Sequence, residues 1–170
     1  MNHVLARWND LSVDEAAEEI LPCCGSRTWA HRMAARKPFV DERALEAVSD
    51  EIWSTLEPSD WLEAFASHPR IGEAASPLGR SAKTRAWSGE EQKNVGTAGE
   101  DLKLALREGN RAYEQRFHRV FIVCATGKSP QEILKILVRR LRNDDSTEVL
   151  EAAEQQRQIT QLRLKKWLKG

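Results

Sequence analysis

Hydrophobic residues recur at three- and four-residue steps along most of the chain, which is the spacing of helices that bury one face. The segment 41–57 carries four such positions on one stripe: Leu45, Val48, Ile52 and Leu56. Comparable stripes predict helices over residues 12–21, 26–37, 41–57, 59–68, 100–117, 129–143 and about 147–167, with a further helix beginning at Ser88. The chain is therefore predicted to be all-α, a bundle of about seven to nine helices.

Two of these helices begin with recognisable caps. Ser12 and Glu15 have the S-x-x-E spacing of a capping box, in which the serine and the acid satisfy each other's backbone N–H groups. Ser129 and Glu132 repeat the arrangement, with Pro130 at the first helical position. Both segments are predicted to start where these serines stand.

The short helix over 59–68 ends in "AFASHPRIGE", where a histidine directly precedes a proline. A residue before proline is pushed out of the helical region, so the helix is expected to stop at His68. The inward-facing side chains of this helix are predicted to be Trp61, Leu62 and Phe65. Taken alone, His68 is better explained as a satisfied or exposed histidine at the end of a helix than as a functional group.

Between Pro69 and Trp87 the periodicity lapses, and the segment is predicted to be a long loop without assigned site residues. The motif "WSGEEQ" then follows, in which Ser88 and Glu91 have the spacing of another capping box and Gln92 continues the helix. A helix N-terminus at Ser88 could also hold an anionic ligand. The later run "FIVCA", residues 121–125, is expected to be extended.

Composition and charge narrow the class of protein. A chain of 170 residues suits a single domain over 1–170, and its 26 basic and 26 acidic side chains give no net field for a nucleic acid partner. It has no apolar run of membrane-spanning length and no signal-peptide pattern at its start, and its last residues "WLKG" are not a peroxisomal S-K-L signal. We therefore expect a cytoplasmic protein without a membrane partner.

The cysteines and histidines do not form a metal-binding pattern. Cys23, Cys24 and Cys124 are too few for a disulfide framework, lack zinc spacing and are expected to be structural. The four histidines are separated by intervals that fit no zinc-hydrolase motif: His3, His31, His68 and His118. We predict no metal site.

Four segments in order change the interpretation of His68. They are "FASHPRIG", "WSGEEQ", "NRAYEQRFHRVFIVCATGKSPQEIL" and "EQQRQITQLRL". Together, from about Leu11 to Leu164, they closely resemble the 2-oxo-4-hydroxy-4-carboxy-5-ureidoimidazoline (OHCU) decarboxylase family of uric acid degradation, a branch of purine metabolism. The resemblance implies an all-helical fold, usually a homodimer, and cofactor-free decarboxylation of OHCU to (S)-allantoin.

The resemblance also assigns roles to individual residues. His68 corresponds to the family's catalytic histidine, with Glu91 as its catalytic partner. The substrate-binding positions that it implies are Pro69, Ser88, Gln92, Phe121, Ile122, Val123, Cys124, Ala125 and Arg163, the segment 121–125 acting through its backbone. We expect His68, Glu91, Gln92 and Arg163 to border one cavity.

The chemistry of the substrate explains these residue types. The OHCU carboxylate is attached to a carbon that bears a hydroxyl and adjoins a ring C=N, so the electrons released with CO2 can move into the ring. The protein must add orientation, exclusion of solvent and a proton, which His68 can deliver near neutral pH. Glu91 would hydrogen-bond His68 or the substrate hydroxyl, and the sequence leaves that choice open. Ser88, Gln92 and Arg163 supply donors for the polar groups of the substrate.

A non-catalytic helical interaction domain is the main alternative. It would keep the hydrophobic stripes and the caps but would need neither His68 nor Gln92. Whether these side chains converge on one site discriminates between the two interpretations. A homodimer is expected, because six tryptophans in an all-α chain of this size should leave an apolar face to pair with a second copy.

Overall fold

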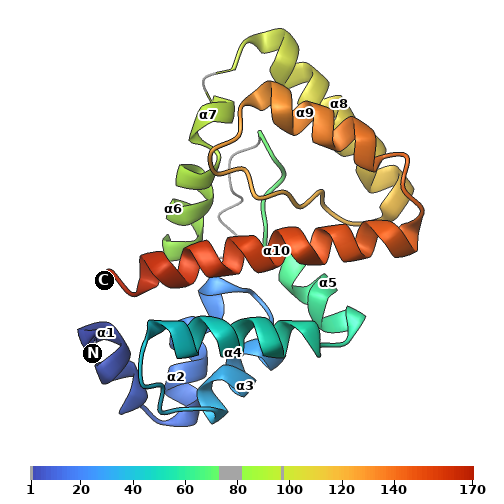
Figure 1. Ribbon diagram of the computed structural model, residues 1–170. Coiled ribbons are helices and arrows are strands. Elements are labelled where there is room, and N and C mark those ends of the chain that lie inside the picture. The colour runs from blue at the N-terminus through green and yellow to red at the C-terminus, as the bar shows by residue number, and fades with distance from the viewer. Residues whose placement is uncertain (1, 73–81, 97) are drawn as a thin grey trace. The chain divides into compact units, whose positions relative to one another are not determined.

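The computed structural model describes residues 2–72, 82–96 and 98–170. These residues form ten α-helices and one short 3-10 helix, with no strand among them (Figure 1). In chain order the elements are α1 (His3–Asn9), α2 (Val13–Ile20), η1 (Leu21–Cys23), α3 (Arg27–Ala35), α4 (Glu42–Ser54), α5 (Pro58–Ala66), α6 (Ala82–Glu91), α7 (Lys93–Gly96), α8 (Glu100–Phe117), α9 (Pro130–Arg140) and α10 (Asp145–Trp167). The prediction of an all-α chain is confirmed.

The chain divides into two compact units. The first comprises Met1–Ala64 with Arg157–Gly170, and the second comprises Phe65–Gln156. The long helix α10 supplies its first half to the second unit and its second half to the first. The single-domain organisation over 1–170 stays a prediction.

The first unit contains tryptophans whose indole N–H groups donate hydrogen bonds, among them Trp8, Trp29 and Trp167. Trp8 meets Trp167 edge to face at 5.6 Å between ring centroids, and both rings are buried. The Trp8 N–H donates to the Ala16 carbonyl at 2.9 Å, and the Trp167 N–H donates to a Glu19 carboxylate oxygen at 3.2 Å. Trp29 donates to the Ser49 hydroxyl at 3.3 Å. A buried indole would otherwise lose a hydrogen bond to water, so these contacts stabilise the packing.

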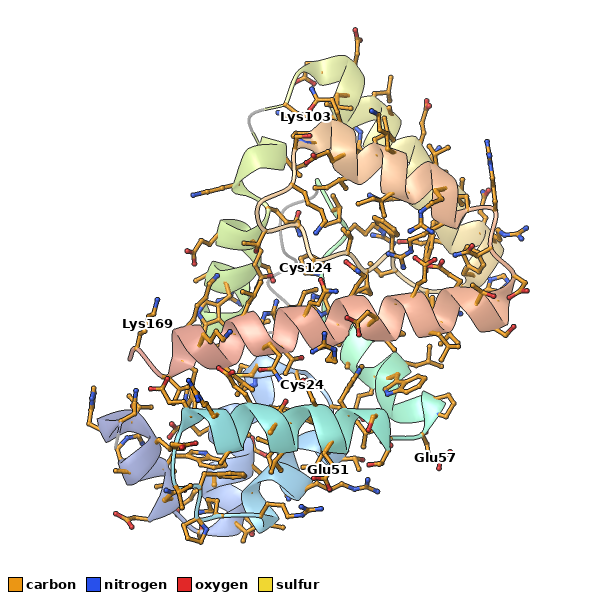
Figure 2. The ribbon with its side chains drawn as sticks, in the orientation of Figure 1. Cys24, Glu51, Glu57, Lys103, Cys124 and Lys169 are labelled. Carbon is orange, nitrogen blue, oxygen red and sulfur yellow. The ribbon has the colours of Figure 1, made fainter. Side chains whose placement is uncertain are left out.

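The cysteines are buried as the sequence predicts for structural residues. Cys23, Cys24 and Cys124 are all free thiols in the interior of their units (Figure 2 labels the last two). Burial raises the pKa of the Cys24 thiol to about 12, so it stays protonated in neutral solution. A protonated, inaccessible thiol is a small hydrophobic side chain rather than a nucleophile.

The caps agree with the prediction at two helix starts. Ser12 and Glu15 form a reciprocal capping box at α2, and Ser129 and Glu132 form another at α9. Helix α8 has the predicted bounds, whereas α1 was not predicted. No helix in the described part of the chain is long and apolar enough to cross a membrane.

Helix α5 buries a narrower face than the sequence predicted. Phe65 is 1% exposed and Trp61 is half-buried, but Leu62 is 43% exposed, so its predicted inward orientation is wrong. Trp61, Ala64 and Phe65 lie three and four residues apart and already fill the face that packs. Leu62, one residue after Trp61, is rotated by about 100° away from that face.

The second correction concerns the start of α6. This helix begins at Ala82, so Ser88 lies in its last turns and is not the N-cap that the "WSGEEQ" motif predicted. The buried side of α6 consists of Thr84, Trp87 and Ser88, at helical spacing but with two polar members. A search for hydrophobic stripes misses a helix whose buried face is partly hydroxylic. Residues 73–81 of the predicted loop lie outside the described residues.

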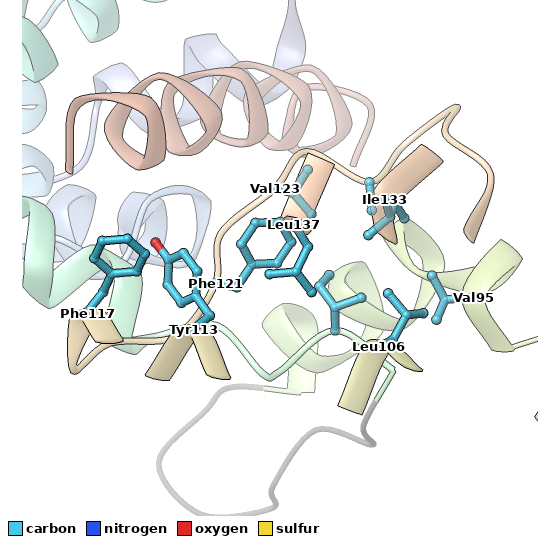
Figure 3. Close-up of a cluster of buried hydrophobic side chains, with 10 residues drawn as sticks. Val95, Leu106, Tyr113, Phe117, Phe121, Val123, Ile133 and Leu137 are labelled. Atoms are coloured by element: carbon cyan, nitrogen blue, oxygen red, sulfur yellow. The ribbon is translucent and has the colours of Figure 1, made fainter. Parts of the chain in front are cut away.

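In the second unit α8 packs against α9 (Figure 1). The segment that connects the two helices in sequence contains the extended residues 121–125. A Cβ on Gly109 of α8 would meet Leu137 Cδ2 of α9 at 2.6 Å, so glycine permits this close approach. Figure 3 shows the core: Ile71, Val95, Leu106, Tyr113, Phe117, Phe121, Val123, Ala125, Ile133 and Leu137. Tyr113 lies between Phe117 and Phe121, with ring centroids 4.7 and 5.2 Å away. These aromatic contacts join α8 to the extended segment.

An ion pair lies inside this unit without access to solvent. The side chains of Arg140 and Glu148 are both 0% exposed, and the Arg140 Nε–H donates to Glu148 Oε1 at 2.9 Å while Nη2 donates to the same oxygen. Tyr113 donates to Glu148 Oε1 at 2.6 Å, and Asn143 donates to Glu148 Oε2 at 2.9 Å. Burial and the carboxylate beside it raise the pKa of Tyr113, so its hydroxyl stays a donor.

The remaining contact of Arg140 reaches the extended segment. Its Nη1–H donates to the Ile122 carbonyl at 2.6 Å, and its guanidinium lies 4.6 Å from the centroid of the Phe121 ring. The pair is thereby completed by hydrogen bonds at both ends, which is the condition for tolerating two buried charges.

Arg140→Met should lower the free energy of unfolding by about 3–5 kcal/mol, because it leaves the Glu148 charge buried without its cation. The matched control is Arg139→Met, next to it in α9. Arg139 pairs with Glu151 at 2.8 Å but is 58% exposed, so its loss should cost roughly 0–1 kcal/mol. Urea unfolding measures both variants, and equal losses would show that the Arg140 pair is not special.

Candidate active site

His68 is buried in the turn that follows α5. The residue is 7% exposed. Its backbone N–H donates to the Phe65 carbonyl at 3.1 Å, which closes the turn. The ring Nε2 lies 2.6 Å from Oε1 of Gln156 in α10. Pro69, which follows, is buried as well. The histidine is thus not a surface residue that merely ends a helix.

The two residues that follow Pro69 are both hydrogen-bonded to side chains of α8. Arg70 pairs with Glu114 through two hydrogen bonds of 2.5 and 3.1 Å. One residue further, the Ile71 carbonyl accepts a hydrogen bond of 2.8 Å from the buried amide of Asn110. The position of the imidazole is therefore fixed by its own turn and by the segment that follows it.

Gln92 binds this same segment. Its side-chain oxygen accepts the Gly72 N–H at 3.1 Å, and Gly72 has a φ of 84°, in the left-handed region that favours glycine. The Gln92 backbone N–H donates to the Ser88 carbonyl at 3.2 Å, which continues the turn at the end of α6. The predicted substrate-binding residue Gln92 thus also connects α6 to the chain four residues after His68.

Ser88 and Glu91 stand on α6 itself. Ser88 is 3% exposed, and Glu91, the last residue of the helix, is half-buried. Because Ser88 is not at a helix N-terminus, the reason given for anion binding there, free N–H groups at a helix start, does not apply.

The segment Phe121 to Ala125 is extended and buried, with every residue 1–5% exposed. Three of its backbone groups are bound by side chains rather than by a neighbouring strand. The Cys124 N–H donates to Oε1 of Gln155 at 2.9 Å, and the Cys124 carbonyl accepts from the Lys128 ammonium at 2.7 Å. With the Arg140 contact at Ile122, these bonds fix the segment along its length.

Residues from all four segments of the family resemblance therefore contact one another within the second unit. Gln155 and Gln156 are neighbours on α10, and one holds the backbone of Cys124 while the other holds the ring of His68. Gln92 joins the same assembly through Gly72. A buried histidine, a fixed stretch of backbone and neutral amides are thus gathered in one part of the fold.

Arg163 lies in the other unit. It is 1% exposed, and its Nη1–H donates to the Pro22 carbonyl at 3.3 Å. A single cavity bordered by His68, Glu91, Gln92 and Arg163 stays a prediction.

Sequence analysis did not single out Gln155, Gln156 and Asn110. They lie inside the segments that carry the family resemblance, but amides at these positions have no characteristic spacing. Their contacts span 31 to 88 positions of sequence, so only the folded chain reveals them. Within the described residues, no three His, Cys, Asp or Glu side chains are grouped so that they could hold a metal ion.

These features define an all-helical protein whose candidate site is organised around one buried histidine. The sequence model of the OHCU decarboxylase family matches residues 9–165. The chain is 32% identical to the 2-oxo-4-hydroxy-4-carboxy-5-ureidoimidazoline decarboxylase of Amia calva, over 92% of this chain and 89% of that protein. It belongs to the OHCU decarboxylase family, and the predicted family is confirmed.

Another similar protein is longer than this chain, and two solved structures have a similar fold. The uric acid degradation bifunctional protein TTL of Arabidopsis thaliana is 32% identical over 92% of this chain, which spans 48% of that protein's length. A crystal structure of OHCU decarboxylase in the presence of (S)-allantoin superposes with a TM-score of 0.76 and 31% identity, covering 90% of this chain and 99% of that one. A crystal structure of (S)-allantoin synthase, 16% identical with a TM-score of 0.69, shares the fold over 96% of this chain and 53% of its own.

Proposed function

We propose that this chain catalyses the cofactor-independent decarboxylation of OHCU to (S)-allantoin in uric acid degradation. The observation that carries the proposal is the buried His68, fixed by Gln156 in the unit that also holds Gln92 and the segment 121–125. A surface helix end would need none of these contacts. Membership of the family supports the substrate class.

The substrate supplies its own electron sink. The bond between the ring carbon and the carboxylate breaks, CO2 leaves, and the electron pair moves into the adjoining ring C=N. The resulting ene-intermediate then takes one proton on one face, which sets the S configuration. The protein's part is to hold the carboxylate away from solvent and to deliver that proton.

The proposed roles follow the chemistry of each side chain. His68 donates the proton, and Glu91 orients His68 or the substrate hydroxyl. Ser88 and Gln92 contact neutral polar groups, Arg163 pairs with an anionic or carbonyl oxygen, and Pro69 with the backbone of 121–125 shapes the pocket. Because Gln92 Oε1 accepts the Gly72 N–H, the amide nitrogen is the group through which Gln92 would donate to the substrate.

His68→Asn should reduce turnover by about 10²–10⁴, the usual contribution of a positioned acid or base. OHCU is generated from urate with urate oxidase and hydroxyisourate hydrolase, and the circular dichroism of (S)-allantoin is followed with and without the protein. Far-ultraviolet circular dichroism should show unchanged helix content. A His68→Asn protein that forms (S)-allantoin at near the parent rate would remove His68 from the mechanism, and an inactive parent would remove the proposed activity.

Glu91→Gln tests the second catalytic role. Glu91 ends α6 and does not cap its start, so the variant should fold with the stability of the parent. The amide keeps the shape but removes the charge, and turnover should fall by about 10-fold or more if the carboxylate orients His68 or the hydroxyl. Parent-like kcat and KM in the same assay would leave Glu91 without a catalytic role.

We also propose a cytoplasmic homodimer without a nucleic acid partner. The support is the family resemblance rather than the tryptophans, since five of the six are buried inside their units and Trp61 is half-buried. Sedimentation velocity at micromolar concentration should give twice the mass of the 19.3 kDa chain. A single 19.3 kDa species would contradict the dimer.

A further inference from the structure

One hydrogen bond of the site determines which nitrogen of the histidine can react. Nε2 of His68 lies 2.6 Å from Oε1 of Gln156, and the two residues are 7% and 0% exposed. The residues are 88 positions apart in sequence, so the contact is made by the fold and not by a local turn. An amide oxygen has no proton to give, which means that the ring nitrogen facing it must be the donor.

We propose that Gln156 is a positioning residue that holds His68 with its proton on Nε2 and so assigns the exchange of protons with the substrate to Nδ1. The inference rests on the proposed decarboxylation and deepens it. A neutral imidazole has one N–H and one bare nitrogen, and the partner of one nitrogen fixes the state of the other. Gln156 thereby removes the ambiguity that an unbound ring would have.

In this scheme the proton passes from Nδ1 of His68 to the carbon of the ene-intermediate. The imidazolium of His68 carries N–H groups at both Nδ1 and Nε2. After CO2 has left, the Nδ1–H bond breaks and a C–H bond forms at the ene-intermediate, using that intermediate's electron pair. The electron pair of the broken N–H bond stays on Nδ1, and the ring becomes the neutral Nε2–H form that Gln156 binds. A proton from water at Nδ1 restores the imidazolium for the next turnover.

The neutrality of Gln156 matters for this role. A carboxylate in the same place would also accept the Nε2–H, but its charge would favour the imidazolium and oppose release of the proton. The amide accepts the same hydrogen bond without adding a charge. Gln155, beside it, holds the Cys124 N–H at 2.9 Å, so α10 fixes the proton donor and the segment 121–125 with two neutral groups.

Nitrogen-15 spectra of the histidine rings test the hydrogen bond directly, whether or not the protein is active. Correlation spectra distinguish a protonated from a bare ring nitrogen, and His68→Asn assigns the His68 signals against the exposed His3, His31 and His118. Neutral His68 should carry its proton on Nε2, with slow exchange against solvent. A bare Nε2 with the proton on Nδ1 would show that the amide of Gln156 is the donor and would overturn the proposal.

Kinetics test the positioning role. Gln156→Leu removes the acceptor at similar volume and should lower kcat by about 10–100-fold with KM changed less than about threefold, while Nε2–H exchange becomes fast. Gln156→Glu keeps the acceptor and should restore the slow Nε2–H exchange, but its charge favours the imidazolium and should leave kcat below that of the parent. Gln158→Leu, two residues away on α10, is the matched control and should leave kcat and the His68 signals unchanged.

The outcomes distinguish a failure of the Gln156 positioning role from a failure of the proposed decarboxylation. An active parent with an equally active, folded Gln156→Leu variant overturns the positioning role and leaves the decarboxylation intact. An inactive parent overturns the proposed function, while the spectra still decide whether Nε2 bears the proton. If Gln156→Leu fails to fold, Gln156→Glu decides: slow Nε2–H exchange supports the role, and fast exchange although the acceptor is kept would contradict it.

Discussion

The buried pair of Arg140 and Glu148 is the interaction on which the second unit depends. Two charges without solvent contact are costly, and their attraction offsets that cost only when the remaining donors and acceptors are also satisfied. Here Tyr113 and Asn143 complete the carboxylate, and the Ile122 carbonyl completes the guanidinium. Tyr113, Ile122 and Asn143 come from different parts of the unit. Because the buried pair is stable only when all three are in place, it fixes their positions relative to one another.

The extended segment 121–125 explains why such a pair is present. Its residues are only 1–5% exposed, and buried backbone N–H and C=O groups need hydrogen-bond partners. A sheet would supply those partners from another strand, but the described residues contain no strand. Arg140, Gln155 and Lys128 supply them from side chains instead. An all-helical fold can thus present a straight stretch of backbone beside a histidine.

The sequence predicted the parts of this fold that local rules control. Helix α8 and the capping boxes of α2 and α9 follow from apolar spacing and from serine–glutamate pairs, which act within a few residues. Helix α6 was placed wrongly because its buried face uses Thr84 and Ser88, which look polar in sequence. For the site, the order of four motifs identified His68 and the segment 121–125, whereas Gln155 and Gln156 act through contacts that only tertiary folding creates.

Charge is distributed in this unit according to what each group must do. The ion pair of Arg140 and Glu148 holds the core of the unit in place. Its strong, directional hydrogen bonds suit a structural part of the protein that keeps the same charge throughout. Gln156 and Gln155, which contact the His68 ring and the Cys124 N–H, are neutral amides. The proton donor proposed for this site, His68, must pass between charged and neutral forms, so a charged group in place of Gln156 would favour one form over the other. The neutral amide of Gln156 holds the ring in place while leaving both forms accessible, whereas the charged pair of Arg140 and Glu148 lies in the core of the unit.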